Sequence, residues 1–275
     1  MPSFVVGDVH GYRDALVLLL GDAGLVDGHE HWSGADARLW LLGDLTDRGP
    51  DGFGAIELVM RLEREAAGNV RCLLGNHDAL ILAVARFADD AVDATGVSFR
   101  ELWMMNGGSV RDLERLESQH LEWIERMPAV ARDGEWLLLH ADTDAYLDLG
   151  ATADAVNEAA REALAHGGPA ELDRLLEVLF DRDAFSDTAR LDRMLAAFGG
   201  SRVVHGHTPI AFVLDEDTAE ITAPLVYAGG RAVNVDHCLF AGGPGFVVEL
   251  GELSAETSAR SLRRSWRFGP RRRSE

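Results

Sequence analysis

The chain has 275 residues, which allows one large domain or two small ones, and its content of 47% hydrophobic and 26% charged residues is ordinary for a globular protein. Every one of its 26 basic residues is arginine, and the formal net charge at pH 7 is −20. A surface this acidic repels polyanions, so we expect no nucleic-acid partner. Two cysteines, Cys72 and Cys238, are too few for a disulfide framework, and we expect both in the core.

The two ends of the chain differ in character. No signal-peptide pattern precedes the first motif, and no apolar stretch approaches the roughly 18 residues that span a bilayer, so we expect a cytoplasmic protein without a membrane partner. Residues 254–275 carry seven arginines and two glutamates, which leaves a charge of −25 on residues 1–253. This tail is an anion-binding arm, a partner-docking segment or an idle terminus, and we favour the last. The sequence makes no prediction about oligomeric state.

Three strand–loop–helix units follow one another in the first ninety residues. Short apolar runs predict strands at residues 4–6, 39–42 and 70–74. Helical spacing of apolar residues predicts helices at residues 12–20, 53–67 and 79–87. Alternation of strands and helices is typical of a layered α/β protein.

The second part of the chain continues this pattern with one long helical segment. We predict a helix at 110–127, a strand at 136–139, mostly helices at 141–198 and a strand at 202–204. Residues 210–250 have a β pattern that glycines interrupt. We therefore predict a single domain at 1–253, in which 141–198 is a helical insertion over the site.

Polar side chains stand where five of the predicted strands end. In open α/β sheets, ligands bind at the carboxyl ends of the strands. One such loop could be a plain turn, and one such histidine could be a core residue, but five in succession predict a shared site. The residues are Asp8, His10, Asp44, Asp47, Arg48, Asn76, His77, His140 and His207.

Two aspartates, one asparagine and three histidines of this set can bind metal ions. Mixed oxygen and nitrogen donors suit Mn, Fe, Zn or Ni better than Ca or Mg, which prefer oxygen alone. The donors are more than one ion needs, so we expect two divalent ions about 3.5–4 Å apart that share one carboxylate.

The same loops resemble the five sequence blocks of the calcineurin-like metallophosphoesterases. These blocks are Gly7-Asp8-Val9-His10-Gly11, Gly43-Asp44-Leu45-Thr46-Asp47-Arg48-Gly49, Gly75-Asn76-His77-Asp78, His140 and Gly206-His207-Thr208. Asp47-Arg48-Gly49, and Trp103 with Asn106-Gly107-Gly108, are similar to the bacterial and phage phosphoprotein phosphatase branch, which acts on phosphoserine and phosphothreonine. Diadenosine tetraphosphatases share these blocks. The resemblance covers about residues 4–250 and implies a layered α/β/β/α sandwich with mixed sheets.

The resemblance also implies a role for each site residue. Asp8 and His10 would hold the first metal, Asp44 would bridge both metals, and the second metal would be held by Asn76, His140 and His207. His77 would be the general acid, oriented by Asp47. Arg48 and Arg182 would bind the substrate phosphate.

Alternatives remain for several of these residues. Arg48 could instead form a loop ion pair with Asp47 or Asp51, and Arg182 could be a solvated arginine between two aspartates. His205 is either a partner of a ligand or a strand residue, and we favour the strand residue. Asp142 stands where the family usually has glycine, which could change the rim of the pocket. Pro209, where other branches have histidine, favours the phosphoprotein phosphatase branch over phosphodiesterases and nucleases.

The function that the resemblance implies is a dinuclear metal-dependent phosphatase, with manganese as the expected metal. It would hydrolyse phosphomonoesters by direct attack of a metal-bridging hydroxide, and phosphoserine or phosphothreonine in protein is the favoured substrate. The alternative is a nucleotide polyphosphate hydrolase of the diadenosine tetraphosphatase type. A metal-free binding module on the same fold is disfavoured, because no expected ligand is missing.

Overall fold

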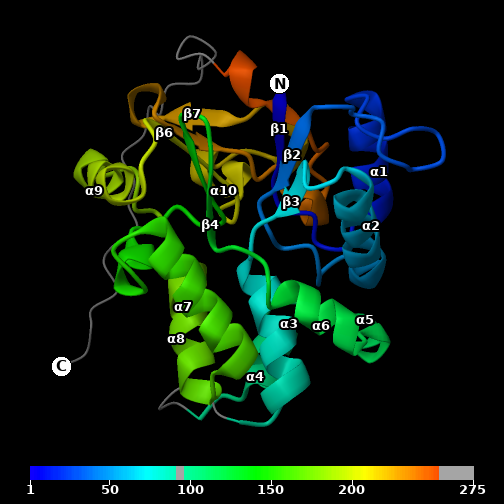
Figure 1. The fold of residues 1–275 in the computed structure, drawn as a ribbon, viewed down its shortest axis with the longest axis vertical. Helices are drawn as coiled ribbons and strands as arrows, with labels where there is room; N and C mark the ends of the chain where they lie inside the picture. The colour runs from blue at the N-terminus through cyan, green and yellow to red at the C-terminus, as the bar shows by residue number, and fades with distance from the viewer. Residues whose placement is uncertain (91–95, 254–275) are drawn as a thin grey trace.

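Two mixed β-sheets lie at the centre of the structure, a computed structural model that describes residues 1–90 and 96–253 (Figure 1). The predicted tail lies outside the described residues. The first sheet has the order β3-β2-β1-β9, with strands Val70–Cys72, Arg38–Leu41, Ser3–Val6 and Val248–Glu249. The second has the order β4-β5-β6-β8-β7, with strands Val130–Asp133, Trp136–Leu139, Arg202–His205, Ala232–Asn234 and Leu225–Tyr227.

Parallel pairing brings the predicted site loops to one edge of each sheet. β1 pairs in parallel with β2, and β2 with β3, while β9 joins in the antiparallel direction. In the second sheet β5, β6 and β8 are parallel to one another, and the edge strands β4 and β7 pair with β5 and β8 in the antiparallel direction. The loops after β1, β2 and β3 therefore all leave the first sheet at one edge. The loops after β5 and β6 likewise leave the second sheet at one edge.

Alternate strand residues face opposite sides of each sheet. Trp40 of β2 and Leu138 of β5 belong to one buried cluster between the sheets, whereas their neighbours Leu41 and Leu139 belong to the larger cluster against the helices. This alternation is the period-2 pattern of strands that are buried on both faces. The cluster between the sheets also includes Val5, Leu42, Leu73, Trp136, Val204 and Val233.

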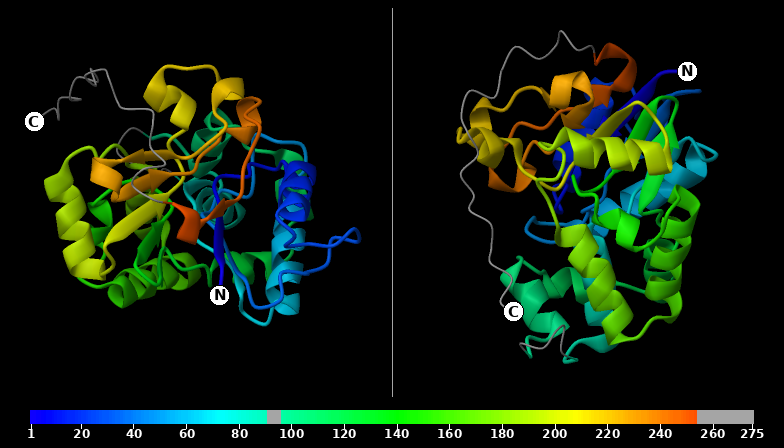
Figure 2. Two further views of the ribbon diagram at one scale, coloured as in Figure 1. Left: turned by 90° about the horizontal axis from the view of Figure 1, so that it is seen from above. Right: turned by 90° about the vertical axis from the view of Figure 1, so that its left-hand side faces the viewer.

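Helices cover the outer faces of both sheets (Figures 1 and 2). α1 (Arg13–Asp22) and α2 (Gly52–Glu65) lie on the first sheet, and α9 (Thr188–Phe198) lies on the second. Their buried faces include Leu16, Ile56 and Leu191, which belong to the large cluster together with strand residues. The resulting order of layers is α/β/β/α, as predicted.

A second group of helices occupies the lower part of Figure 1. It contains α3 (Asn76–Phe87), α4 (Phe99–Met105), α5 (Val110–Arg115), α6 (Ser118–Ile124), α7 (Ala153–His166) and α8 (Pro169–Phe180). α3 packs against both α4 and α8. The predicted helical segment 141–198 thus contains α7, α8, α9 and the short helix η1 (Ala145–Asp148). Within residues 1–90 and 96–253, no helix has the length and apolar character that crossing a bilayer requires.

Several predicted elements are wrong in extent. The helix predicted at 110–127 is two helices, because the backbone at Leu116 and Glu117 is extended and His120 accepts a hydrogen bond from the Glu117 amide at 2.9 Å. Strand β4 was not predicted. Residues 210–250 are less β-rich than predicted, since they contain α10 (Ile210–Leu214), η2 (Thr218–Glu220), η3 (Ala228–Gly230) and η4 (Leu239–Ala241). A last short helix, η5 (Leu250–Glu252), follows β9.

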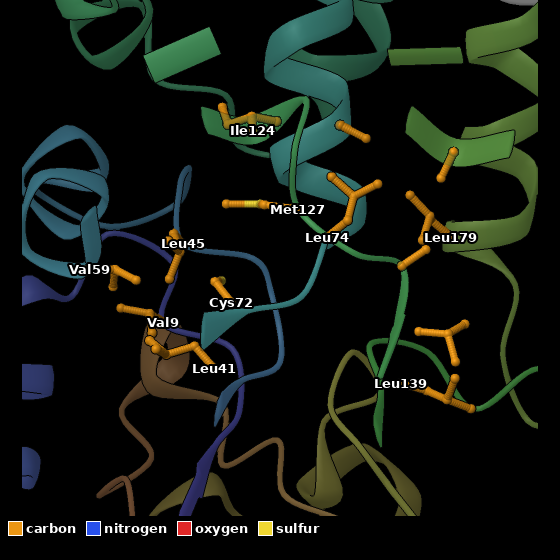
Figure 3. Packing of buried hydrophobic residues seen from close by; sticks show 14 of the residues in the cluster. Val9, Leu41, Leu45, Val59, Cys72, Leu74, Ile124, Met127, Leu139 and Leu179 are labelled. Carbon is orange, nitrogen blue, oxygen red and sulfur yellow. The ribbon is translucent and has the colours of Figure 1, made fainter. Parts of the chain in front are cut away.

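The loops that leave β1 and β2 are anchored in the core by their own apolar residues. Val9 and Leu45 are completely buried, and both belong to the large cluster with Leu41 and Cys72. Figure 3 shows these four side chains close together, with Leu139 and Leu179 on the side of the second sheet. Cys72 and Cys238 are unpaired and buried, as predicted. The polar residues on either side of Val9 and Leu45 are therefore held by the core itself.

His237 is a buried imidazole whose ring nitrogens have no hydrogen-bond partner among the described residues. Its ring meets that of Phe246 edge-on at 5.1 Å. Burial lowers the pKa of His237 to about 4, whereas the unfolded chain has a histidine pKa of about 6.5. As the pH falls below about 6.5, the unfolded state takes up a proton first, so the free energy of unfolding decreases down to about pH 4.

Replacement of the His237 imidazole should remove its contribution to the pH dependence of the free energy of unfolding. Relative to wild type, we expect the free energy of unfolding of His237→Leu to rise by up to about 3 kcal/mol between pH 7 and pH 4. Urea denaturation of both proteins at pH 7, 5.5 and 4 measures this difference. The other buried histidines contribute equally to both proteins, so parallel pH profiles would contradict the assignment.

Candidate metal centre

All six predicted metal ligands lie together at the carboxyl ends of strands from both sheets. Asp8 follows β1, Asp44 follows β2, and Asn76 begins α3 after β3. His140 follows β5 and His207 follows β6, which brings in the second sheet. These five side chains and His10 are buried.

Two groups of potential ligands share one carboxylate. His10, Asp44 and His77 place ligand atoms within 4.8 Å of one another, and so do Asp44, His140 and His207. Asp44 thus has the position that a bridging carboxylate requires. The remaining predicted ligands are adjacent: Asp8 Oδ2 lies 3.8 Å from His10 Nε2, and Asn76 Oδ1 lies 2.9 Å from His140 Nε2.

The imidazoles of His10 and His140 are oriented for metal binding. His10 Nδ1 lies 3.1 Å from the Thr46 carbonyl oxygen, and His140 Nδ1 lies 2.8 Å from that of Leu42. A carbonyl only accepts hydrogen bonds, so each Nδ1 carries the proton and each Nε2 keeps a lone pair. His10 Nε2 lies 3.7 Å and His140 Nε2 lies 3.6 Å from a carboxylate oxygen of Asp44. Burial lowers the pKa of His10 well below its usual value and that of His140 to about 3. Neutral imidazoles of this kind fit a metal ion.

Negative charge accumulates at the same place. Burial raises the pKa of Asp8 well above its usual value, and the nearby carboxylates of Asp236 and Asp44 raise it further. Burial likewise raises the pKa of Asp44, with a further contribution from Asp78. Buried like charges destabilise one another unless a cation offsets them. The donor atoms and their charge therefore fit divalent cations.

Half of the ten predicted site residues have a left-handed backbone, which non-glycine residues rarely adopt. Each such residue costs about 1–3 kcal/mol and persists only where its surroundings hold it. The φ angles are 45° for His10, 54° for Asp44, 67° for Asp47, 63° for Arg48 and 65° for His207. Five of the twelve non-glycine residues with a positive φ in the described part of the chain are thus predicted site residues.

Asp78 holds the loop after β2 against the start of α3. Its carboxylate accepts hydrogen bonds from the backbone amides of Asp44 at 2.7 Å, Leu45 at 3.0 Å and Gly75 at 3.1 Å. Because the Asp78 carboxylate accepts the hydrogen bond of the Gly75 amide, α3 begins at Asn76, three residues before the predicted start. A Cβ atom on Gly75 would lie 2.2 Å from Asp44 Oδ1, so only glycine fits there.

His77, Asp47 and Trp103 form a buried hydrogen-bonded chain. The Asp47 carboxylate lies 2.8 Å from His77 Nδ1 and accepts a hydrogen bond from Trp103 Nε1, also at 2.8 Å. Burial raises the pKa of Asp47 to about 7, although the Trp103 bond opposes the change. Burial, reinforced by Arg48, lowers the pKa of His77 well below its usual value. Both shifts favour the uncharged form of each group, and the bond between Asp47 and Nδ1 fixes the orientation of the His77 ring.

Arg48 points into the site rather than toward the carboxylates of its own loop. Its Nη1 lies 2.9 Å from His10 Nε2, and its Nη2 lies 3.0 Å from His77 Nε2. The guanidinium stacks 4.3 Å above the ring of Phe240. Asp51 pairs with Arg115 at 2.8 Å instead, so the alternative of an Arg48–Asp51 ion pair is wrong.

A cleft of about 200 Å³ opens above these residues. Asp44 and His207 line it, together with Arg48, Arg182 and Phe240. Arg182 follows α8, and its charge helps to lower the pKa of His140 and His207. The structure thus brings Arg182 to the site. A larger surface cavity of about 570 Å³ near Trp123 lies elsewhere and contains neither group of ligands.

Comparison with known proteins agrees with this geometry. The family described as calcineurin-like phosphoesterase matches residues 1–241. The chain belongs to this family. The predicted resemblance is therefore confirmed, and the metal-free module on the same fold has no support from the site.

Two curated relatives match part of this phosphoesterase. The symmetrical bis(5'-nucleosyl)-tetraphosphatase of Neisseria gonorrhoeae is 29% identical over 141 residues, which cover 51% of this chain and 43% of the relative. The enzyme of the same name from Cronobacter sakazakii is 43% identical over 84 residues, 30% of this chain and 26% of the relative. The match spans less than half the length of these relatives.

A solved structure shows that the fold itself is known. The cold-active protein-tyrosine phosphatase of a psychrophilic Shewanella species has a TM-score of 0.67 and 21% sequence identity, and the match covers 90% of this chain and 75% of that chain. At this identity the likeness concerns the fold alone. It confirms the predicted fold class of the phosphoesterase.

Some residues at the site of this phosphoesterase were not predicted. Asp236 follows β8, is buried, and has its pKa raised to about 6, chiefly by burial. The search for polar residues that directly follow a strand would have identified it if it had included β8. Phe240 and Trp103 are different, because their contacts with Arg48 and Asp47 join segments far apart in sequence. His205 Nε2 lies 2.8 Å from the Tyr227 hydroxyl, which fits the favoured interpretation of His205 as a strand residue.

Proposed function

We propose that the chain is a dinuclear metal-dependent phosphatase that hydrolyses phosphomonoesters. The observation that carries the proposal is the position of Asp44 in two groups of ligands, beneath a cleft bordered by two arginines. Asp8 and His10 would hold one cation, Asn76, His140 and His207 the other, and Asp44 both. When bound, the cations would polarise the phosphoryl oxygens and lower the pKa of water. We propose manganese, although Fe, Zn and Ni suit the same donors.

The side chains of the cleft supply the remaining chemistry. The guanidinium groups of Arg48 and Arg182 would bind the phosphoryl oxygens and offset their charge. His77, oriented through Nδ1 by Asp47, would donate a proton to the leaving oxygen. The stacking of Arg48 on Phe240 limits the freedom of the guanidinium before the substrate binds.

We propose phosphoserine or phosphothreonine in a cytoplasmic protein as the substrate. The cleft of about 200 Å³ is smaller than the 300–1,000 Å³ typical of sites that enclose a whole small molecule. A volume of this size suits a phosphorylated side chain, with the rest of the substrate outside.

The second candidate is hydrolysis of a nucleotide polyphosphate. The curated relatives carry the name of a bis(5'-nucleosyl)-tetraphosphatase, and the arginines of the cleft suit a polyphosphate equally well. The charge of −25 on residues 1–253 disfavours a highly anionic dinucleotide, although the charge near the cleft matters more.

The two candidates are distinguished by phosphate release from two substrates side by side. The full chain, reconstituted with Mn, is assayed with a phosphothreonine peptide and with diadenosine tetraphosphate. We expect the peptide to be preferred by at least about a hundredfold in kcat/KM, about 2.7 kcal/mol of discrimination in the transition state. The reverse preference would favour the nucleotide, and no release from either substrate would overturn the proposed activity.

A further inference from the structure

Asp142 lies just beyond the metal ligand His140, and its side chain connects two other segments of the site. We propose that Asp142 is a positioning residue, which holds Arg182 at the cleft and fixes it relative to His207. The inference rests on the proposed function, because it uses the roles proposed above for Arg182 and His207. The position of Asp142 two residues after His140 did not by itself suggest this role.

One carboxylate oxygen of Asp142 fixes the segment that carries His207. Asp142 Oδ1 accepts a hydrogen bond from the Thr208 hydroxyl at 2.9 Å. The neighbouring His207 has a left-handed backbone, with φ of 65°, and its amide donates to Asp8 Oδ1 at 3.0 Å. The two bonds hold this strained segment from both sides, so the His207 ring keeps its direction.

The other oxygen of Asp142 fixes the segment that carries Arg182. Asp142 Oδ2 accepts a hydrogen bond from the Asp183 amide at 3.2 Å, and the Asp142 carbonyl accepts one from the Ala184 amide at 2.8 Å. On the other side of Arg182, the Asp181 carboxylate accepts a hydrogen bond from the hydroxyl of Thr143. Residues 142–143 thus hold the backbone that follows Arg182 and the side chain of the residue that precedes it.

This attachment acts on a strained part of the loop. Asp183 has φ of 69°, a left-handed conformation that a non-glycine residue keeps only where its surroundings hold it. The Arg182 side chain is exposed, so its reach into the cleft depends on where its backbone lies. Asp142 itself is 5% exposed, and both of its carboxylate oxygens are used in these bonds.

The test measures phosphate binding without turnover. Inorganic phosphate is titrated calorimetrically into the Mn-loaded full chain for wild type, Asp142→Asn, Arg182→Ala and the double variant. In Asp142→Asn, the side chain has one acceptor oxygen instead of two, so it cannot accept the hydrogen bonds of both the Thr208 hydroxyl and the Asp183 amide. We expect the Kd for phosphate to rise about tenfold in either single variant and to rise no further in the double variant, because both changes remove the same contact.

A second variant tests the attachment of His207 alone. Thr208→Val removes the hydroxyl that donates a hydrogen bond to Asp142 and keeps the shape of the side chain. We expect the apparent Kd for Mn to rise about tenfold or more, as for other residues that orient metal ligands. An unchanged affinity for Mn would overturn this half of the inference.

Asp133→Asn is the matched control. Asp133 is 4% exposed, accepts a hydrogen bond from Trp40 Nε1 at 3.1 Å and pairs with Arg38 at 2.8 Å. It lies opposite Trp136, at the end of β5 away from His140. The control should lower Tm and leave phosphate and Mn binding unchanged.

The outcomes separate this inference from the proposed function. If Asp142→Asn behaves like Asp133→Asn, or if its effect adds fully to that of Arg182→Ala, Asp142 has only a structural role. A wild type that binds no phosphate would overturn the inference as well. A wild type that binds phosphate, with the expected pattern in the variants, but hydrolyses no phosphoester would overturn the proposed function alone.

Discussion

Asp44→Asn is expected to lower kcat by about 10³-fold or more, a loss of about 4 kcal/mol of transition-state stabilisation. Asp44 is the one residue common to both groups of ligands. An amide has a single neutral acceptor oxygen and cannot bridge two cations as a carboxylate does. The phosphate release assay with the Mn-reconstituted variant measures the loss, and its Mn content, measured by atomic absorption, should fall with it.

Unfolding in the presence of a chelator separates this effect from misfolding. Burial and neighbouring carboxylates raise the pKa of Asp44 well above its usual value, so its charge destabilises the metal-free fold. The amide keeps an acceptor for the His77 amide, which now donates to Asp44 Oδ1 at 2.8 Å. We therefore expect Asp44→Asn without metal to have a Tm equal to or above that of wild type.

Addition of Mn should then reverse the order of the two proteins. A wild type that binds the ion in its folded state should gain stability by mass action, and the variant should gain less. A metal-free variant that is clearly less stable than wild type would show that Asp44 mainly supports the fold. An equal gain in Tm with Mn would contradict its place in the metal centre.

The strand-end residues of the site could be predicted because of the way parallel strands end. β1, β2 and β3 have matching directions, so polar residues that follow each of them meet at one edge. The same rule brings His140 and His207 together after β5 and β6. That two sheets pack face to face was predicted only from the resemblance to a family. No local sequence pattern specifies how two sheets face each other.

The remaining features of the site depend on tertiary contacts. Trp103 and Asp47 are 56 residues apart in sequence, and Phe240 reaches Arg48 from the other end of the chain. The left-handed backbone of Asp44 and His207 has no local signal either, because non-glycine residues adopt it only under external constraint. Long-range packing therefore determines how the site residues are aimed, and the sequence pattern determines which residues are available.

His77→Asn is expected to slow the release of poor leaving groups far more than that of good ones. Asn can replace the hydrogen bond to Asp47, which His77 Nδ1 now makes at 2.8 Å, but it cannot donate a proton to a leaving oxygen. Loss of a general acid typically costs about 10²–10⁴-fold in rate. We expect a loss of this size in kcat/KM for a phosphoserine peptide, and a loss below about tenfold for p-nitrophenyl phosphate, whose leaving group needs no proton.

Comparison of the two substrates also tests the other role that the geometry allows. His77 lies with His10 and Asp44 in one group of potential ligands, and a metal-binding His77 would affect every substrate alike. Equal losses on the peptide and the aryl phosphate, with a lower Mn content, would therefore assign His77 to the metal centre. A selective loss with unchanged Mn content would assign it to the leaving group, because only proton donation depends on how poorly that group departs.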